Sequence, residues 1–468
     1  MTPPDSIGTF RDFTMRILHI STRLILGGSQ ENTVLSCEGQ ARMGHEVHLA
    51  FGPIYGPEGS LLTRVEGFNK AQGTKFKVQM QQANAGGGDN GSGNDRSGIT
   101  IHEVRHLVRE VSPLRDWRAI RELQSLIRTI KPDVVHTHSS KAGVLGRIAA
   151  WREGGRNNRL KVVHTIHGPP FMPVEGGLLQ RTNVRLSNAM YTLAERHAAK
   201  RCHVIVSVAD AMTRLFLSRR IGRPEQYVTV NSGMETQPYL QAAPGEDRVS
   251  VRSRLGITDT DFVIGTVARL AQHKGHDDLL DALAADLKAH PSWKLLWVGD
   301  GWWRDRLIAK ARASGVHVRE LDTLAHSPSS TVSSTSDLPH PTSQIAPQLL
   351  ITGLVPPDRI PGLMRAMDVL VHPSYREGLP RTVPQALLAG VCPIAYDCDG
   401  TPEVVRNHDT GLLVTTGDPD KLRDAVGWSF EHPREREEMA IRGRAECTER
   451  FSAETMVREL DRVYRSGM

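Results

Sequence analysis

Two successive series of short β-branched runs and longer helical patterns constrain the fold of this chain more than any other feature. In the first half, most short runs are separated by a helical pattern. This order is typical of βαβ units, whose parallel strands form a sheet that helices cover on both faces. We therefore predict strands at Arg16–Ile20, Glu46–Phe51, Ile99–Val104, Asp133–His136, Lys161–Ile166 and His203–Val208, and helices at Gln30–Met43, Arg115–Ile130, Lys141–Trp151 and Leu178–Lys200.

The alternation then starts again, which predicts two doubly wound α/β domains. Ser232–Glu246, rich in Gly, Pro and Gln, is the expected linker. We expect an N-terminal extension over 1–14, a first domain over 15–235 and a second over 236–468, with the last helix either on its own domain or packed back on the first. Two such domains place a ligand cleft between the carboxyl ends of their sheets. The second series predicts strands at Asp261–Val267, Lys294–Val298, Leu349–Thr352, Val369–His372 and Cys392–Tyr396, and helices at His276–Lys288, Trp302–Ala313, Thr382–Ala389 and Pro419–Glu431.

Two segments depart from a globular composition. Residues 81–98 contain six glycines, and residues 322–347 contain 15 Ser, Thr or Pro in 26 positions. Neither segment has enough apolar surface to offset the entropy of ordering it. We predict that both are flexible surface insertions, which leaves about 200 residues for each domain of the 468-residue chain.

The composition also narrows the compartment and the partners. No apolar stretch is long enough to span a membrane, and the N-terminus lacks the apolar region of a signal peptide. The five cysteines are scattered and form no CxxC pair, which favours a reducing cytoplasm and argues against a zinc ribbon.

The net charge of +6 is modest, so it does not require nucleic acid, but it favours anionic ligands or an anionic membrane surface. The helical pattern 178–200 is rich in arginine. It is compatible with peripheral contact with anionic lipid at the inner face of the cytoplasmic membrane, or with a solvated helix face.

The first glycine turn is Gly27-Gly28-Ser29, after the first predicted strand and just before a helix. Glycines let a ligand approach the backbone, and a helix N-terminus offers N–H groups to an anion, although a plain tight turn has the same sequence. The chain has no true GxGxxG, one that follows a predicted strand and opens a predicted helix, and it lacks GxxxxGK[ST], which argues against a standard dinucleotide enzyme and a P-loop NTPase.

Charged residues follow two strands of the second domain. Arg269 and Lys274 come after 261–267, and Glu377 comes after 369–372. Two cations at a strand end suit a diphosphate leaving group, and a carboxylate suits the hydroxyls of a polyol. A helix starting at Thr382 aims the amides of Thr382 and Val383 at a bound anion or sugar oxygen. Solvated loop charges are the alternative interpretation.

Four histidines, His136, His138, His164 and His167, gather at two neighbouring strand ends. A polar cleft wall explains them better than a metal site, because no carboxylate or cysteine completes a ligand set by spacing. The pair Asp397 and Asp399 has the spacing of a divalent-ion site. We nevertheless expect no metal at either place.

In order along the chain, these segments resemble glycosyltransferase family 4. Each motif is weak by itself, but together they follow the right ends of the right strands from about Arg16 to Arg462. The matching segments are Gly27–Val34, Met43–Val47, Asp133–Gly143, His164–Pro169, Arg269–Gly275, Val298–Trp302, Glu377–Gln385 and Gly400–Val405.

The resemblance implies a GT-B architecture, with two doubly wound Rossmann-like domains facing a central cleft. It implies a retaining hexosyltransferase that takes a sugar from a UDP- or GDP-linked donor without a metal or other cofactor. The implied acceptor is a glycan or lipid-linked sugar, in cell-surface polysaccharide or glycolipid biosynthesis.

The resemblance also assigns residues. Arg269 and Lys274 neutralise the diphosphate, Glu377 contacts donor-sugar hydroxyls, Gly28 approaches the diphosphate or the acceptor from the first domain, and His167 contacts the reacting sugar. The implied catalytic residues are Glu377, His167, Lys274 and Arg269; the donor-binding residues are Gly28, Arg269, Lys274, Glu377, Thr382, Val383, Gln385 and Glu403; and the acceptor-side residues are Gly27, His138 and His167.

One position departs from the family pattern, which has a second glutamate where this chain has Gln385. In the family that glutamate binds the nucleotide ribose. A glutamine amide still hydrogen-bonds ribose hydroxyls but loses the strength of a charged acceptor, so we expect altered nucleotide affinity with transfer retained.

Three other functions fit parts of the pattern. A non-catalytic nucleotide-sugar binder in an assembly complex would bind donor without turning it over. A GT-B epimerase would turn over donor without an acceptor. A nicotinamide-dependent oxidoreductase is disfavoured because no GxGxxG stands between a predicted strand and a predicted helix.

Overall fold

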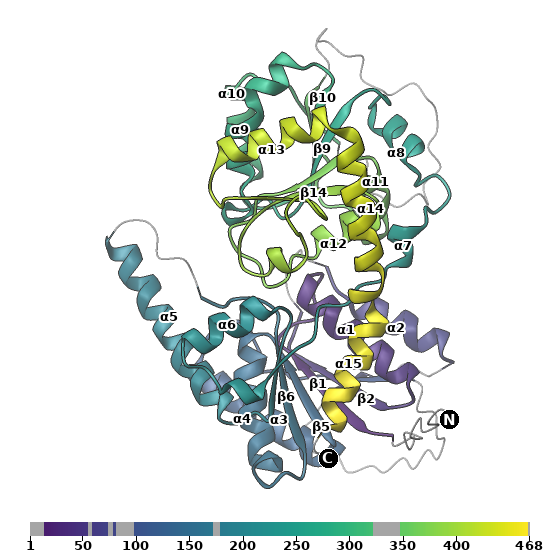
Figure 1. Ribbon diagram of the computed structural model, residues 1–468. Helices are drawn as coiled ribbons and strands as arrows, with labels where there is room; N and C mark the ends of the chain where they lie inside the picture. The colour runs from purple at the N-terminus through teal and green to yellow at the C-terminus, as the bar shows by residue number, and fades with distance from the viewer. Residues whose placement is uncertain are drawn as a thin grey trace, which may run out of the picture. The chain divides into compact units, whose positions relative to one another are not determined.

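The computed structural model describes residues 14–54, 59–73, 78–80, 98–171, 178–321 and 347–466, with only the backbone described for 78–80 and 178–180 (Figure 1). The predicted insertions 81–98 and 322–347 lie outside these residues except for Gly98 and Pro347, and so does the predicted extension 1–14 except for Thr14.

The chain divides into two compact units. Unit 1 contains Met1–Ser207, Leu215–Val230 and Met456–Met468, and unit 2 contains Val208–Arg214 and Asn231–Thr455. The division near residue 230 lies five residues before the predicted boundary. Unit 1 also includes the end of the chain from Met456, which is the second of the two places considered for the last helix.

Unit 1 is built on a sheet of eight parallel strands in the order β3-β4-β2-β1-β5-β6-β7-β8. The strands are β1 (Arg16–Ser21), β2 (Glu46–Phe51), β3 (Val78–Met80), β4 (Ile99–Glu103), β5 (Val134–His138), β6 (Lys161–Ile166), β7 (Val204–Ser207) and β8 (Tyr227–Thr229). The helices up to residue 218 are α1 (Gly28–Arg42), α2 (Leu62–Ala71), α3 (Pro113–Ile130), α4 (Ser140–Glu153), α5 (Leu178–Ala199) and α6 (Asp210–Ser218).

Unit 2 is built on seven parallel strands in the order β11-β12-β10-β9-β13-β14-β15. The strands are β9 (Phe262–Val267), β10 (Trp293–Val298), β11 (Val318–Glu320), β12 (Leu349–Ile351), β13 (Val369–His372), β14 (Cys392–Tyr396) and β15 (Leu412–Val414). The remaining helices are α7 (Gln237–Leu240), α8 (Arg248–Leu255), α9 (His276–Ala289), α10 (Arg304–Ala313), α11 (Ile360–Arg365), α12 (Thr382–Leu388), α13 (Pro419–Glu431), α14 (Pro433–Arg450) and α15 (Ala453–Arg465).

The predicted strands are confirmed, with ends that differ by at most two residues. The four strands that were not predicted, β3, β8, β11 and β15, are the outer strands of the two sheets and have three residues each. A run of three residues is too short to show a periodic pattern, and an edge strand is not buried on all sides.

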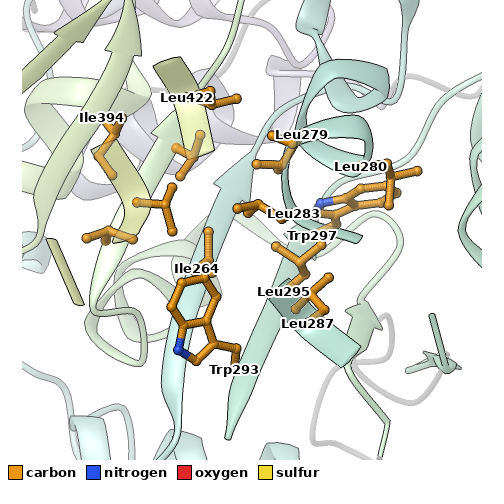
Figure 2. Close-up of a cluster of buried hydrophobic side chains, with 14 of the residues drawn as sticks. Ile264, Leu279, Leu280, Leu283, Leu287, Trp293, Leu295, Trp297, Ile394 and Leu422 are labelled. Carbon is orange, nitrogen blue, oxygen red and sulfur yellow. The ribbon is translucent and has the colours of Figure 1, made fainter. Parts of the chain in front are cut away.

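The core of unit 2 is mostly aliphatic, with two tryptophans (Figure 2). Leucines of α9 pack against Leu295 and Trp297 of β10 and Ile264 of β9, all of them fully buried. Because both faces of the sheet are covered, polar groups are pushed toward the ends of these strands.

The last helix, α15, packs in unit 1 from Met456 onward. It lies against α1, where a Cβ on Gly39 would meet Val457 Cγ2 at 2.4 Å, so only glycine allows this approach. Asp461 pairs with His45 over 3.0 Å, and Tyr464 OH accepts a hydrogen bond from Gln40 Nε2 over 3.0 Å. The position of α15 is therefore set by buried polar contacts with α1 and its flanking loop.

His276, the first residue of α9, is a buried histidine that makes the stability of the unit 2 core depend on pH. The residue is 2% exposed, and neither ring nitrogen has a hydrogen-bond partner among the described residues. Its ring meets Trp297 edge-on at 5.0 Å. Burial lowers the pKa of His276 to about 3 from its usual value of about 6.5.

We predict that His276→Leu stabilises the protein, because leucine leaves no polar atom unpaired. The unfolded histidine takes up a proton below about pH 6.5, whereas the folded one stays neutral down to about pH 3, so the wild type loses stability over that window as the pH falls. The advantage of the variant in the free energy of unfolding should be about 2 kcal/mol larger at about pH 5 than at about pH 8, measured by urea unfolding.

The control is His317→Leu, which removes an exposed histidine from the same unit. An advantage of His276→Leu that is equal at both pH values would show that His276 is charged in the folded protein.

Candidate functional site

The centre of the candidate site in unit 2 is an ion pair between two neighbouring strand ends. Lys274 lies in the 3₁₀ turn Gln272–Lys274 that follows β9, and Glu377 lies in the loop after β13, which pairs with β9. Lys274 Nζ and Glu377 Oε1 are 2.5 Å apart. The structure therefore brings together two of the residues that the sequence predicts.

The local backbone explains why this lysine reaches this glutamate. Gly275 has φ of 70°, and a Cβ there would lie 1.9 Å from the carbonyl oxygen of Pro373. Only glycine permits the turn after β9 to press against the loop after β13. The Lys274-Gly275 pair thus carries the ammonium group to the exit of the neighbouring strand.

A third side chain, His372 at the end of β13, joins the pair. Its Nε2 lies 3.0 Å from the same Glu377 oxygen, and its Nδ1 lies 3.2 Å from Thr382 Oγ1. The sequence analysis missed His372 as a site residue. Its place as the last residue of a buried strand, five residues before Glu377, was the available signal.

The electrostatics keep Glu377 ionised. Burial opposes its charge, but Lys274 and the hydrogen bond from His372 outweigh burial and hold the pKa of Glu377 well below its usual value. The backbone N–H of Glu377 donates to Asp399 Oδ2 over 2.8 Å, which fixes the loop. Glu377 Oε2 accepts no hydrogen bond from the described residues, so a carboxylate oxygen is available for a ligand hydroxyl.

Arg269 is placed differently from Lys274. It is exposed, and its guanidinium carbon lies 5.6 Å from the centroid of the Trp302 ring. Trp302 itself is 68% exposed. A cation held beside an exposed aromatic face suits an anionic ligand with a planar base or sugar face.

The other donor-side residues lie on α12 and beyond. Thr382 starts α12 and contacts His372, Val383 is buried, and Gln385 is half-buried with no side-chain hydrogen bond among the described residues. The first turn of α12 therefore begins within the Glu377 and His372 network.

Glu403 lies in a different environment. Its Oε2 accepts from the backbone N–H of Asp210 over 2.8 Å and its Oε1 from that of Ala211 over 2.7 Å, at the start of α6. The structure gives Glu403 no contact with Glu377 or Lys274. Both of its oxygens are used to cap a helix, so its predicted place among the donor-binding residues has no support from this geometry.

In unit 1, the predicted residues lie at the carboxyl ends of adjacent strands. Gly27 and Gly28 are exposed, and α1 starts at Gly28 after β1. His138 ends β5 and His167 follows β6 by one residue, with His138 Nδ1 3.1 Å from His167 Nε2. Since β1, β5 and β6 are consecutive in the sheet, one edge collects these groups.

Three buried histidines, His19, His136 and His138, have ring nitrogens within 4.8 Å of one another, which raises the question of a metal. Each ring already uses both nitrogens in hydrogen bonds to neighbouring side chains. A metal ion would have to replace at least two of these bonds. The geometry is explained by hydrogen bonding, and the expectation of no metal remains a prediction.

Unit 1 also has a cavity of about 380 Å³ that the sequence analysis missed. It lies near the ends of β1 and β5 and combines cationic side chains with an apolar wall from α4 and α5. Separated basic residues give no local signal, because they come together only when these segments pack. The residues that carry this character are Arg23, Arg109, Lys141, Val144, Leu145 and Tyr191.

In a comparison with known proteins, each of the two units matches a family model. The model of the glycosyl transferase 4-like domain matches residues 27–233, and the model of glycosyl transferases group 1 matches residues 261–432. The UDP-Gal:alpha-D-GlcNAc-diphosphoundecaprenol alpha-1,3-galactosyltransferase of Escherichia coli is 26% identical over 69% of this chain and 73% of that protein. The D-inositol 3-phosphate glycosyltransferase of Acidothermus cellulolyticus is 26% identical over 72% of this chain and 67% of that protein.

Solved structures agree on the fold. The Anabaena protein HepE, in complex with UDP-glucose, superposes with a TM-score of 0.67 at 18% identity and covers 97% of this chain and 100% of that one. The predicted GT-B architecture with two Rossmann-like domains is confirmed. Because the two family models account for both units, this chain is a glycosyltransferase and belongs to glycosyltransferase family 4.

Proposed function

We propose that this enzyme is a retaining glycosyltransferase that moves a hexose from a UDP- or GDP-linked donor to a lipid-linked or oligosaccharide acceptor in cell-surface polysaccharide or glycolipid biosynthesis. The ion pair of Lys274 with Glu377, held by His372, is the observation that carries the proposal. Retention is what family 4 implies, and no metal or other cofactor is included.

Unit 2 supplies the groups that the donor needs. As the bond to the leaving group breaks, negative charge grows on the diphosphate, and Lys274 and Arg269 are the cations at the end of β9 to stabilise it. The ionised Glu377 accepts hydrogen bonds from sugar hydroxyls through Oε2 while Oε1 holds Lys274 in place. Because neighbouring strand ends and His372 hold the pair in place, little reorganisation is required during the reaction.

The relatives support both nucleotide classes. HepE is solved with UDP-glucose, and a relative from Corynebacterium glutamicum is named as GDP-mannose-dependent. The acceptor of the Escherichia coli relative is named as a diphosphoundecaprenol. The cavity of unit 1 suits such an acceptor, because Arg23 and Arg109 offer charge for a diphosphate and Tyr191 an apolar surface, while Lys141 is paired with Asp116 over 2.7 Å.

We also propose that α5 rests on anionic lipid. Leu186, Met190 and Leu193 are 62%, 58% and 63% exposed, and Arg181 and Arg185 lie on the same helix. Exposed apolar side chains beside arginines are typical of a helix that lies in a membrane interface. Among the described helices, none is both long enough and apolar enough to cross a bilayer.

Lys274→Ala and Glu377→Ala should each lower turnover at least roughly tenfold, the scale of one lost transition-state contact. Turnover is measured as release of nucleoside diphosphate from a panel of UDP- and GDP-sugars, with and without a lipid-linked acceptor. Thermal shifts with the same panel identify the donor that binds, because a ligand raises apparent stability.

The matched controls are Lys288→Ala and Glu435→Ala, which remove exposed charges from the same unit. Near-normal activity of both site variants would remove the pair from the active site. Binding without turnover would identify a non-catalytic binder, and conversion of the donor without acceptor would identify an epimerase.

Gln385→Glu should tighten nucleotide binding by about 1 kcal/mol, because a charged acceptor strengthens a hydrogen bond to a ribose hydroxyl. Calorimetric titration with the identified nucleotide measures the change. Gln237→Glu adds the same charge at an exposed position of unit 2 and should have no effect. Equal affinities in wild type and Gln385→Glu would place Gln385 outside the ribose site.

Neutralising Arg181 and Arg185 together by substitution with Gln should weaken binding to vesicles containing phosphatidylglycerol by about 2 kcal/mol, or roughly thirtyfold, at about 1 kcal/mol for each charge. Co-sedimentation with these vesicles measures the change in affinity. Replacing exposed Arg423 and Arg434 of unit 2 by Gln removes the same charge and should leave binding unchanged. Wild-type protein that stays in solution with these vesicles would contradict the proposed contact.

A further inference from the structure

The loops that carry the candidate site of unit 2 leave three neighbouring strands and are bonded to one another. The backbone N–H of Tyr375 donates to the carbonyl oxygen of His273 over 2.9 Å, and Ser374 Oγ donates to the same oxygen over 3.2 Å. Cys398 Sγ donates to the carbonyl oxygen of Ser374 over 2.9 Å. Since β13 lies between β9 and β14 in the sheet, its loop is held from both sides.

One carboxylate oxygen joins the same three strand exits from the side of α9. Asp278 lies in the first turn of α9 and is half-buried. Its Oδ2 accepts a hydrogen bond from Tyr375 OH over 2.5 Å and another from Tyr396 OH over 2.6 Å. Hydrogen bonds from hydroxyls to a carboxylate have about this length and are stronger than those between neutral groups. Asp278 therefore ties the loop after β13 and the end of β14 to the start of α9.

The two tyrosines also pack against each other. Their rings meet edge to face, with centroids 5.6 Å apart and planes at 77°. Tyr396, the last residue of β14, is fully buried, whereas Tyr375 is 38% exposed. A buried tyrosine hydroxyl needs a partner, which Asp278 provides for Tyr396. Because the ring of Tyr396 is enclosed in the core, its hydroxyl holds the carboxylate in place, and the carboxylate in turn holds Tyr375.

Each of these three anchoring residues lies within four positions of a group in the candidate site. The pairs are Asp278 with Lys274, Tyr375 with Glu377, and Tyr396 with Asp399. Glu377 contacts the other two site groups, because its Oε1 lies 2.5 Å from Lys274 Nζ and its N–H donates to Asp399 Oδ2 over 2.8 Å. Movement of an anchoring residue would therefore disturb the ion pair.

We propose that Asp278 is a positioning residue for glycosyl transfer. Through the hydroxyls of Tyr375 and Tyr396, it holds three strand exits together so that Lys274 and Glu377 meet in one geometry. This inference rests on the proposed function for what the ion pair does toward the donor. The rival role is that Asp278 only stabilises the start of α9, as an acidic side chain in a first turn does.

Hydrogen exchange in the ligand-free protein, followed by mass spectrometry, tests the positioning role directly. Asp278→Ala removes the shared acceptor, so the amides of Tyr375 and Glu377 should exchange at least roughly tenfold faster, the scale of a lost hydrogen bond to a charged group. Exchange in the core strand β10 should not change. Asp277→Ala is the matched control, because it removes a carboxylate from the same turn that pairs with two basic side chains of α10. It should leave the exchange of both segments unchanged.

The same variants are then compared in turnover. Asp278→Ala should lower kcat at least roughly tenfold, with KM for the donor near the wild-type value, because the loss is one of preorganisation. Asp278→Asn keeps an acceptor oxygen for the hydroxyls and should restore most of kcat. Tyr375→Phe removes one hydroxyl but keeps the ring. It should reproduce the faster exchange and the lower kcat, and it tests the proposal even where Asp278→Ala does not fold.

The outcomes separate this inference from the proposed function. Loop exchange in Tyr375→Phe equal to that of wild type, or faster loop exchange with normal kcat, overturns the positioning role while glycosyl transfer stands. Faster exchange throughout unit 2, or an equal effect of Asp277→Ala, also overturns it, because the rival role at the start of α9 would then be the cause. Absence of transfer by wild type with every donor overturns the proposed function, and hydrogen exchange still decides whether Asp278 fixes the loop.

Discussion

Helices cover both faces of each parallel sheet, and the rest of the structure depends on this constraint. A polar side chain in such a strand is shielded from water, so it needs a partner within the sheet or must lie at the strand's end. In unit 2 the core is aliphatic, and the charged side chains lie at the ends of β9 and β13. In unit 1 the polar side chains have partners within the sheet: histidines on β1, β5 and β6 form hydrogen bonds to one another and to neighbouring side chains.

The polar groups of the two units differ in charge. The site of unit 2 contains an ion pair, whereas the buried histidines of unit 1 are bonded to one another. Glu377 remains ionised because Lys274 and the hydrogen bond from His372 outweigh the effect of burial. Such a pair supplies a fixed field for a ligand whose charge grows during reaction. His136 and His138 of unit 1 are neutral, because burial holds the pKa of each well below its usual value and no carboxylate offsets it. A neutral ring donates a hydrogen bond through one nitrogen and accepts one at the other, so it orients its neighbours without adding charge.

Much of this was visible in the sequence. The restarted alternation predicted two parallel sheets, and the turn of Lys274-Gly275 and the loop of Glu377 were placed at strand ends, where parallel strands bring side chains together. The edge strands β3, β8, β11 and β15 were not visible, because three residues show no period. His372 was missed because it reads as the last residue of a buried strand, and Asp278 because nothing in a helical pattern reveals that an acidic residue of its first turn meets two tyrosines.

Local pattern thus determined that this chain folds into two βαβ series with charges at the exits of particular strands, because periodicity and strand ends are properties of short segments. Only the tertiary structure decided which groups meet. It assigned Glu403 to the start of α6, brought α15 to α1, collected Arg23, Arg109 and Lys141 around one cavity, and joined Asp278 to Tyr375 and Tyr396. These contacts join segments from tens to hundreds of residues apart, and hydrogen bonding between such segments depends on how the elements pack rather than on the order of residues within any one of them.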